Sequence, residues 1–418
     1  MSKRSGHADL PLHGGRVPGW LASRMSALGR VMAEAIVLHY GRHELLCRLA
    51  HPFWFQSFGA VMGMDWHSSG ITTSVIGALK RGLEPVADEL GIYVCGGRGK
   101  HSRKTPAELL RVGERLGIDG AGLARTSRLV AKVDSAAVQD HFALYLHGFI
   151  LSADGDWTVV QQGMAPQRRL ARRYHWHSRD VDSFVQTPHS AVAGPSQGPI
   201  LNLVAREANA ARAAQVKLLG ETPARLLGLW GESLRKAEAT PQLTLPHHHD
   251  VRASDVATKR LHATLAAATE AGPQDFPDLL LVPGVGPRTV EVLAHIASIV
   301  HGTPTEFDDP ARFSFALGGK DGLPFPVPLA VYDKTLDVFR SAISNAKLGH
   351  RERLDAIARL DRQARALDGV VSGLPFESLI ATERRRVSAF EPRTVFDKRT
   401  EPPRPGPKSK QGGQLALF

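Results

Sequence analysis

Cysteine is rare in this 418-residue chain, which contains only Cys47 and Cys95. Two cysteines exclude a disulfide-rich scaffold, and such scarcity is typical of proteins kept in a reducing cytoplasm. Long apolar runs are missing as well, so no segment of the sequence would span a bilayer, and residues 1–7 lack the apolar region of a signal peptide. We therefore expect a cytoplasmic protein without a membrane partner.

Acidic residues are in the minority among the charged ones. The chain has 52 Lys and Arg against 41 Asp and Glu, which gives a formal net charge of +11. A basic surface commonly attracts polyanions such as nucleic acid, although many basic proteins bind none. The hydrophobic content of 43% is enough for packed cores, and the length indicates two domains and a tail.

The predicted fold class is α+β. Residues 1–240 are predicted to form a mostly helical domain with a small antiparallel sheet, whose β-hairpin near residues 142–162 turns at Ala-Asp-Gly-Asp. Residues 241–252 contain three consecutive histidines and are predicted to be a linker, because no cysteine or carboxylate stands at zinc spacing. Residues 253–370 are predicted to form an α-helical domain, and the Pro/Gly-rich residues 388–418 a disordered tail.

The sequence Pro-Gly-Val-Gly-Pro-Arg at residues 283–288 predicts a tight turn between two helices. Pro283 ends the first helix and Pro287 suits the first position of the second, while Gly284 and Gly286 allow a close approach of the backbone. Free N–H groups at a helix N-terminus can hold an anion. The stretch around residues 274–300 resembles the helix-hairpin-helix module, which grips a DNA phosphate without reading sequence. This resemblance implies DNA contacts by Gly284, Val285, Gly286, Arg288 and Thr289. The alternative is an ordinary turn between packed helices.

The chain ends in Gln-Leu-Ala-Leu-Phe at residues 414–418, after a Pro/Gly-rich stretch. Apolar residues at the tip of such a tail have no core of their own to enter. The pentapeptide resembles the bacterial motif that binds the replicative sliding clamp. That resemblance implies a hydrogen bond from Gln414 and groove contacts by Leu415, Leu417 and Phe418. The alternative is a terminal strand that packs against the protein itself.

Residues 96–104 form a basic, glycine-rich stretch. Its loop and the helix start that follows offer backbone and side-chain donors to phosphate. Because the spacing does not match a P-loop, DNA phosphate is a better ligand than a hydrolysed nucleotide. The predicted DNA contacts here are Arg98, Lys100, Arg103 and Lys104, and the alternative is a solvated loop.

Cations alternate with aromatic residues at positions 172–177, Arg-Arg-Tyr-His-Trp-His. Stacking on bases combined with phosphate contact requires such a mixture, so Arg172 and Arg173 are predicted to bind DNA. The alternative is an amphipathic edge strand that buries Tyr174 and Trp176.

Three aspartates supply hard oxygen donors of the kind that hold Mg²⁺ or Mn²⁺ in nucleases: Asp65, Asp134 and Asp140. The hypothesis of a divalent-metal catalytic centre has these aspartates bind the metal, His67 or His147 assist proton transfer, and Lys132 stabilise the phosphate. The candidate catalytic residues are therefore Asp65, His67, Lys132, Asp134, Asp140 and His147. The alternatives are helix caps for the aspartates and packing beneath the β-hairpin for the histidines.

Several long strings occur in order along the chain, among them Pro-Phe-Trp-Phe-Gln at 52–56, Asp-Trp-His-Ser-Ser-Gly at 65–70 and Ala-Arg-Arg-Tyr-His-Trp at 171–176. With them the chain resembles an uncharacterised bacterial and archaeal family, domain of unknown function 763, over roughly residues 6–365. The family supplies identity without chemistry, because it has no assigned activity to carry over.

A weaker resemblance is to DNA glycosylases, which place a catalytic aspartate about two dozen residues after a helix-hairpin-helix. Asp308 and Asp309 stand at that distance from Gly284. Lyase-type members carry a lysine where this chain has Arg288, and arginine is a poor Schiff-base nucleophile. The resemblance therefore favours base excision less than the other functions.

These patterns together predict a nucleoid-associated, DNA-binding protein of replication-linked repair or recombination. The sharper hypothesis is a metal-dependent nuclease tethered to the sliding clamp. The alternative from another class is a non-catalytic DNA-binding adaptor that brings partners to the clamp. The sequence leaves open whether the protein is an enzyme.

Overall fold

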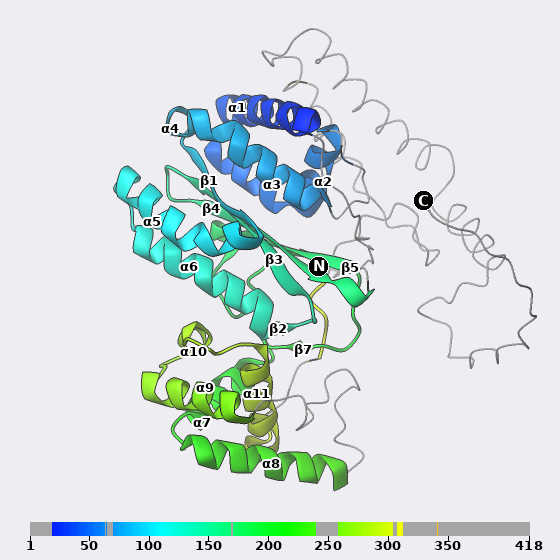
Figure 1. Cartoon of the computed structure of the whole chain (residues 1–418), viewed down its shortest axis with the longest axis vertical. Coiled ribbons are helices and arrows are strands. Elements are labelled where there is room, and N and C mark those ends of the chain that lie inside the picture. The colour runs from blue at the N-terminus through cyan, green and yellow to red at the C-terminus, as the bar shows by residue number, and fades with distance from the viewer. Residues whose placement is uncertain are drawn as a thin grey trace, which may run out of the picture. The chain divides into compact units, whose positions relative to one another are not determined.

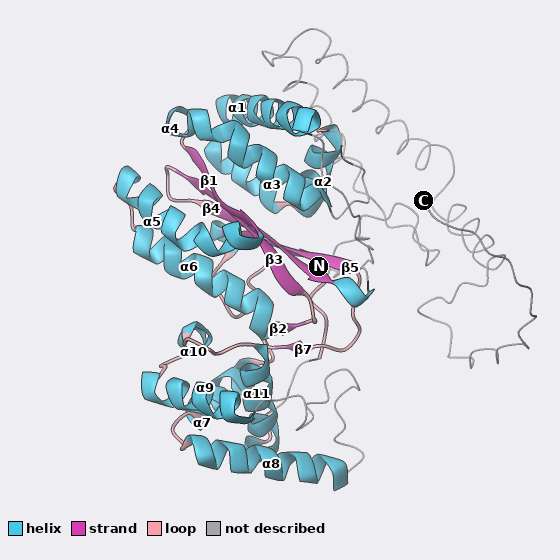
Figure 2. Ribbon diagram, viewed as in Figure 1, coloured by secondary structure: helices cyan, strands magenta, loops and turns pink. Residues whose placement is uncertain are grey.

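Helices cover both faces of an antiparallel β-sheet in this protein (Figure 1, Figure 2). The structure is a computed structural model that describes residues 19–62, 64, 70–168, 170–239, 258–303, 307–311 and 341. All of these residues belong to one compact unit. The observed helices and sheet confirm the predicted α+β class. Within the described ranges, no helix combines the length and apolar character that a bilayer crossing requires.

The first four helices are α1 (Gly19–Ala50), α2 (Pro52–Val61), α3 (Gly70–Leu83) and α4 (Ala87–Leu90). Within α1 the backbone of Gly41 leaves helical geometry, with φ 86° and ψ 167°. A positive φ is readily adopted by glycine, which explains why α1 kinks at this position. The second part of α1 is thereby set at its own angle over the sheet.

The main sheet has the strand order β1-β3-β4-β5-β6, and each neighbouring pair is antiparallel. Its strands are β1 (Ile92–Arg98), β3 (Ala143–Ser152), β4 (Trp157–Ala165), β5 (Leu170–His177) and β6 (Ala191–Ala193). Strands β3 and β4 form the predicted hairpin, with Leu151 opposite Trp157 beside the turn. A second, two-stranded sheet pairs β2 (Val138–Gln139) with β7 (Leu201–Asn202).

Each face of the main sheet buries its own core, because successive strand residues point to opposite faces. On β3, Leu146 and Ile150 pack with α1, α2 and α3, whereas Phe149 belongs to the core on the other side. That second core is covered by α5 (Thr105–Leu116) and α6 (Gly120–Lys132). The sheet is therefore buried on both faces, and its strands bury polar side chains such as Arg172 and Arg173 of β5 beside apolar ones.

The remaining helices are α7 (Asn209–Leu218), α8 (Pro223–Ala239), α9 (Thr258–Ala271), α10 (Phe276–Leu281) and α11 (Pro287–His301). Phe276 of α10 and Val290 of α11 belong to the same hydrophobic core as Leu129 of α6. Residues from both sides of the predicted 241–252 linker thus share one core. The linker itself lies outside the described residues.

Candidate functional site

The turn between α10 and α11 is built as its glycines and prolines require. The N–H of Val285 donates to the carbonyl of Val282 at 3.1 Å, and the Val285 side chain is buried. Gly284 has φ +90°, a conformation that L-residues rarely adopt. Gly286 is the N-cap of α11, and Pro287 occupies its first turn.

Helix α6 and strand β2 contact this hairpin on its inner side. The Lys132 ammonium group donates to the carbonyl of Val285, and the Gln139 amide donates to the carbonyl of Pro287 at 2.9 Å. A third contact is the ion pair of Arg125 with Asp278 at 2.8 Å. Burial lowers the pKa of Lys132. Lys132 therefore positions the hairpin rather than acting in catalysis as predicted, because its ammonium group is hydrogen-bonded to the hairpin backbone.

The outer side of the turn is accessible to solvent. Gly284 and Arg288 are exposed, and the Arg288 side chain, 54% accessible, pairs with Glu291 at 3.1 Å. Thr289 is buried, so its side chain does not face outward. The N–H groups of Arg288 and Thr289 stand in the first turn of α11, where an α-helix provides no intrahelical partner. The turn thus has backbone donors at the start of α11 and one exposed cation, Arg288.

The basic, glycine-rich stretch continues β1 into a short 3₁₀ segment, Gly99–Lys104. All four of its predicted DNA contacts are exposed: Arg98, Lys100, Arg103 and Lys104. Thr105, which begins α5, is buried and its hydroxyl donates to the carbonyl of Ser102 at 2.8 Å. The four cations are therefore placed as a phosphate-binding surface needs them, although a solvated loop would show the same exposure.

Arg172 and Arg173 do not hold as DNA contacts, because both side chains are fully buried in the sheet. The Arg172 guanidinium donates to Asp140 at 2.9 Å and holds both oxygens of Asp309, at 3.0 and 2.6 Å. On the other face, Arg173 donates to Gln56 at 2.8 Å and packs over the Phe55 ring. The alternating pattern of β5 instead describes a strand buried on both sides.

Arg172 and its two carboxylates form a buried ionic network. Asp140 also accepts a hydrogen bond from the Tyr174 hydroxyl at 2.6 Å, and Asp309 accepts one from the Gln197 N–H at 2.6 Å. Desolvation alone would lower the pKa of Arg172, but the charges of Asp140 and Asp309 more than offset it and raise that pKa. Asp309, one of the two candidate aspartates of the glycosylase alternative, therefore has a structural role.

Asp134 is the centre of a second buried network. Its oxygens accept hydrogen bonds from the Trp176 indole at 3.0 Å, from the His189 imidazole at 2.5 Å and from the Gln161 amide. Gln161 in turn accepts from Nδ1 of His147 at 2.6 Å. Both carboxylate oxygens of Asp134 therefore accept hydrogen bonds from other side chains of the protein.

His147 is fully enclosed in that network. Because Gln161 takes the Nδ1 proton, Nε2 of His147 is the acceptor for the Ser127 hydroxyl at 2.9 Å. Burial lowers the pKa of His147. A buried ring with both nitrogens engaged by protein groups is a packing histidine, which corrects the predicted role in proton transfer.

The predicted divalent-metal centre is not assembled within the described part of the chain. Neither Asp134 nor Asp140 belongs there to a group of three or more histidine, cysteine or carboxylate ligands. Their oxygens bind Trp176, Tyr174 and other donors, so a metal ion would have to displace buried hydrogen bonds. The remaining two members, Asp65 and His67, lie outside the described residues.

The predicted clamp-binding residues also lie outside the described residues: Gln414, Leu415, Leu417 and Phe418. That prediction therefore stays a prediction.

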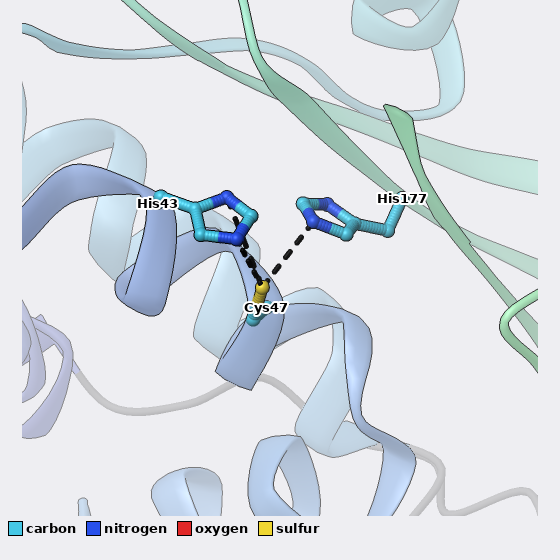
Figure 3. A group of neighbouring side chains, drawn as sticks. All are labelled: His43, Cys47 and His177. Atoms are coloured by element: carbon cyan, nitrogen blue, oxygen red, sulfur yellow. Dashed lines mark hydrogen bonds between the residues drawn. The ribbon is translucent and has the colours of Figure 1, made fainter. Parts of the chain in front are cut away.

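Among the described residues, one group could hold a metal: His43, Cys47 and His177, which the sequence patterns did not bring together (Figure 3). The Cys47 sulfur lies 3.3 Å from Nε2 of His43 and 3.3 Å from Nε2 of His177. Burial, followed by the charge of Glu44, raises the pKa of the Cys47 thiol. The His-x-x-x-Cys spacing on one helix was the available signal, but the third ligand is 130 residues away.

Comparison with known proteins places the chain by family alone. No curated protein and no solved structure matches it. One family matches, over residues 6–327, and it includes the sheet, the buried networks and the α10–α11 hairpin. Because the match covers more than half of the chain, the protein belongs to the family described as Protein of unknown function (DUF763).

Proposed function

We propose that this protein binds DNA through the phosphate backbone, with the α10–α11 hairpin as the primary contact. The observation that carries the proposal is the turn itself. Gly284 and Arg288 are exposed there, beside backbone N–H groups that the first turn of α11 leaves without helical partners. Such groups at a helix N-terminus favour an anion, both as hydrogen-bond donors and through the helix dipole.

The rigidity of the turn supports the same proposal. Lys132 and Gln139 bind the inward carbonyls of Val285 and Pro287. The turn is therefore ordered before any ligand arrives, which lowers the entropic cost of binding. Nothing in the contact would read base edges, so recognition would follow the backbone of the DNA rather than its sequence.

The exposed cations of the 98–104 stretch extend the proposal to a second phosphate contact. Four side chains of this stretch are exposed to solvent: Arg98, Lys100, Arg103 and Lys104. Contacts of this kind release condensed counterions, so affinity would fall steeply with salt.

Between the two classes of DNA-binding function, the non-catalytic adaptor is favoured over the nuclease. The carboxylates of Asp134 and Asp140 are saturated by buried protein donors. The terminal pentapeptide, residues 414–418, would then bring the DNA-binding part to the sliding clamp in replication-linked repair or recombination.

Replacement of Gly286 by aspartate tests the hairpin without damaging it. The backbone of Gly286 is extended and a Cβ there has ample room, while aspartate is a preferred N-cap residue. The new carboxylate would bind the N–H groups of α11 and repel phosphate. We expect unchanged or higher thermal stability and at least about a tenfold weaker affinity for duplex DNA in fluorescence anisotropy.

The matched control is Gly228→Asp, which adds the same charge at an exposed position of α8 with open space around it. It should bind DNA as the wild type does. Arg288→Ala should reduce the salt dependence by one phosphate, a change in log–log slope of about 0.9. Equal affinity of Gly286→Asp and wild type would refute the hairpin as the contact. Clamp capture by the full chain, lost on removal of residues 414–418, tests the tail separately.

A further inference from the structure

His43, Cys47 and His177 direct three ligand atoms to one point between α1 and the end of β5 (Figure 3). His43 and Cys47 are four residues apart and therefore share one face of the helix, after the kink at Gly41. His177 ends β5 and is buried. The ligands thus stand on regular elements, which hold a metal geometry better than loops do.

The separations fit a tetrahedral ion. The sulfur of Cys47 lies 3.3 Å from each of the two Nε2 atoms, and all three ligand atoms lie within 4.8 Å of one another. Zinc bonds of about 2.3 Å to sulfur and about 2.0 Å to nitrogen place two tetrahedral ligands roughly 3.5 Å apart. Nδ1 of His43 also lies 3.9 Å from the sulfur, so this imidazole would have to turn for its Nε2 to face the ion.

The other nitrogen of each imidazole has a partner of the type that supports metal-ligating histidines. Nδ1 of His177 lies 3.3 Å from the carbonyl of Trp157 and 3.2 Å from the Thr158 hydroxyl. That hydroxyl already donates to the carbonyl of Leu46, so it accepts from His177. Nδ1 of His43 faces the Asp156 carboxylate at 3.5 Å. Carbonyl and carboxylate partners of this kind fix the tautomer of a metal-ligating histidine.

Two imidazoles therefore lie against a single thiol. The S–H group of Cys47 carries one proton and can donate it to one histidine at a time. A cation satisfies the thiolate and both imidazoles together. The surroundings are suited to one, since Asp156 faces His43 and is itself held by Arg179 through two hydrogen bonds, at 3.1 and 2.7 Å.

We propose that His43, Cys47 and His177 bind a zinc ion, with water as the fourth ligand. Thiolate and imidazole are the ligands of borderline-soft metals, whereas Mg²⁺ and Mn²⁺ prefer oxygen. The His43 side chain is 41% accessible, so solvent reaches the ion. The site connects the second part of α1 to the end of β5. It is independent of the DNA-binding hairpin, and either proposal stands if the other fails.

Metal content of the tag-free, full-length protein tests the site. After reduction, exposure to Zn²⁺ and removal of excess, we expect one zinc ion per chain by elemental analysis. Cys47→Ala and His43→Gln should lose it, and neither change disturbs a fully buried side chain. Asp156→Asn, which removes the carboxylate charge that faces His43 and that Arg179 binds, should weaken zinc affinity by about 10- to 100-fold.

Three matched controls should keep the full zinc content. Cys95→Ala removes the other thiol, and His39→Gln removes an exposed histidine one turn earlier on α1. Replacement of the three histidines at 247–249 by glutamine excludes the remaining histidine cluster of the sequence. Cobalt in place of zinc should give a thiolate-to-cobalt absorption band that Cys47→Ala alone abolishes among the cysteine variants. Absence of zinc from the reduced wild type, or an equal zinc content in Cys47→Ala, would overturn the proposal.

Discussion

Two histidine-containing clusters lie on opposite faces of β5, and adjacent residues of the strand contribute to them. Trp176 donates to Asp134 in the first cluster, while His177 faces Cys47 in the second. In the first cluster each proton has an acceptor and each oxygen a donor, from Ser127 through His147 to Asp134. In the second, two imidazoles lie against one thiol, which has a single proton to donate.

The difference shows how the chemistry of a cluster depends on what remains unsatisfied. Carboxylates and histidines are the residue types of metal-dependent catalysis. In the Asp134 cluster, however, these groups are hydrogen-bonded to one another and to other side chains, as buried polar groups must be. The His43–Cys47–His177 group has fewer ligands and more unmet bonding capacity. A ligand is expected where the protein's own groups leave such capacity.

The largest loss of stability is expected on replacement of Arg172, whose ion pairs with Asp140 and Asp309 are almost completely buried. Arg172→Leu would leave Asp140 and Asp309 buried without their cation. Removal of one partner from a buried ionic network typically costs about 3–5 kcal/mol in the free energy of unfolding. Denaturant unfolding measures this loss directly, and we expect the midpoint to fall while the m-value stays unchanged.

Two further variants separate the buried charge from the lost contacts. Replacing Arg172, Asp140 and Asp309 together by apolar residues should cost much less than Arg172→Leu, because no charge is then stranded. Arg125→Ala removes a half-exposed ion pair with Asp278 and should cost less than about 1 kcal/mol. A stability loss for Arg172→Leu as small as that of Arg125→Ala would contradict the structural role of the network.

A smaller effect is expected from Asp134→Ala. The substitution leaves the donors of Trp176, Gln161 and His189 without their acceptor. Unsatisfied buried donors cost about 1–3 kcal/mol each, partly recovered by relaxation, so we expect a loss of about 2–3 kcal/mol in unfolding free energy. Calorimetric titration with Mn²⁺ should give the same result for the variant as for the wild type. Metal binding that disappears with Asp134 would instead restore it as a metal ligand.

Much of the fold could be predicted from local sequence. The β3–β4 hairpin follows from alternating apolar residues around Ala-Asp-Gly-Asp, and α5 from Thr-Pro at its start. The α10–α11 turn follows from its glycines and prolines. Strand β1 was missed because its glycines, Gly96 and Gly97, indicate a loop. They are tolerated because a side chain at Gly96 would collide with the carbonyl of His147 on the neighbouring strand.

The candidate site was less predictable, because the partners of a side chain are set by tertiary contacts. The Arg172–Asp309 pair spans 137 residues, and no local pattern distinguishes a buried arginine from one that binds phosphate. Likewise His177 joins Cys47 across 130 residues. The difference between the two sets of cations is their exposure. Those at 98–104 are exposed and can reach a phosphate, whereas Arg172 and Arg173 of β5 are buried and cannot.

The smallest effect concerns pH and again separates the two clusters. Burial lowers the pKa of His147, so below the unfolded value of about 6.5 the unfolded chain binds a proton that the folded chain excludes. The contribution to stability is complete above that pH and is lost as the pH falls toward the lowered pKa, by up to about 1.4 kcal/mol per pH unit. In His147→Gln this proton is absent, so the unfolding free energy should fall less steeply with acid than in the wild type. Denaturant unfolding at several pH values below 6.5 measures the two slopes. Parallel curves would show that His147 becomes protonated in the folded protein, and the Asp134 cluster would then not be closed to solvent.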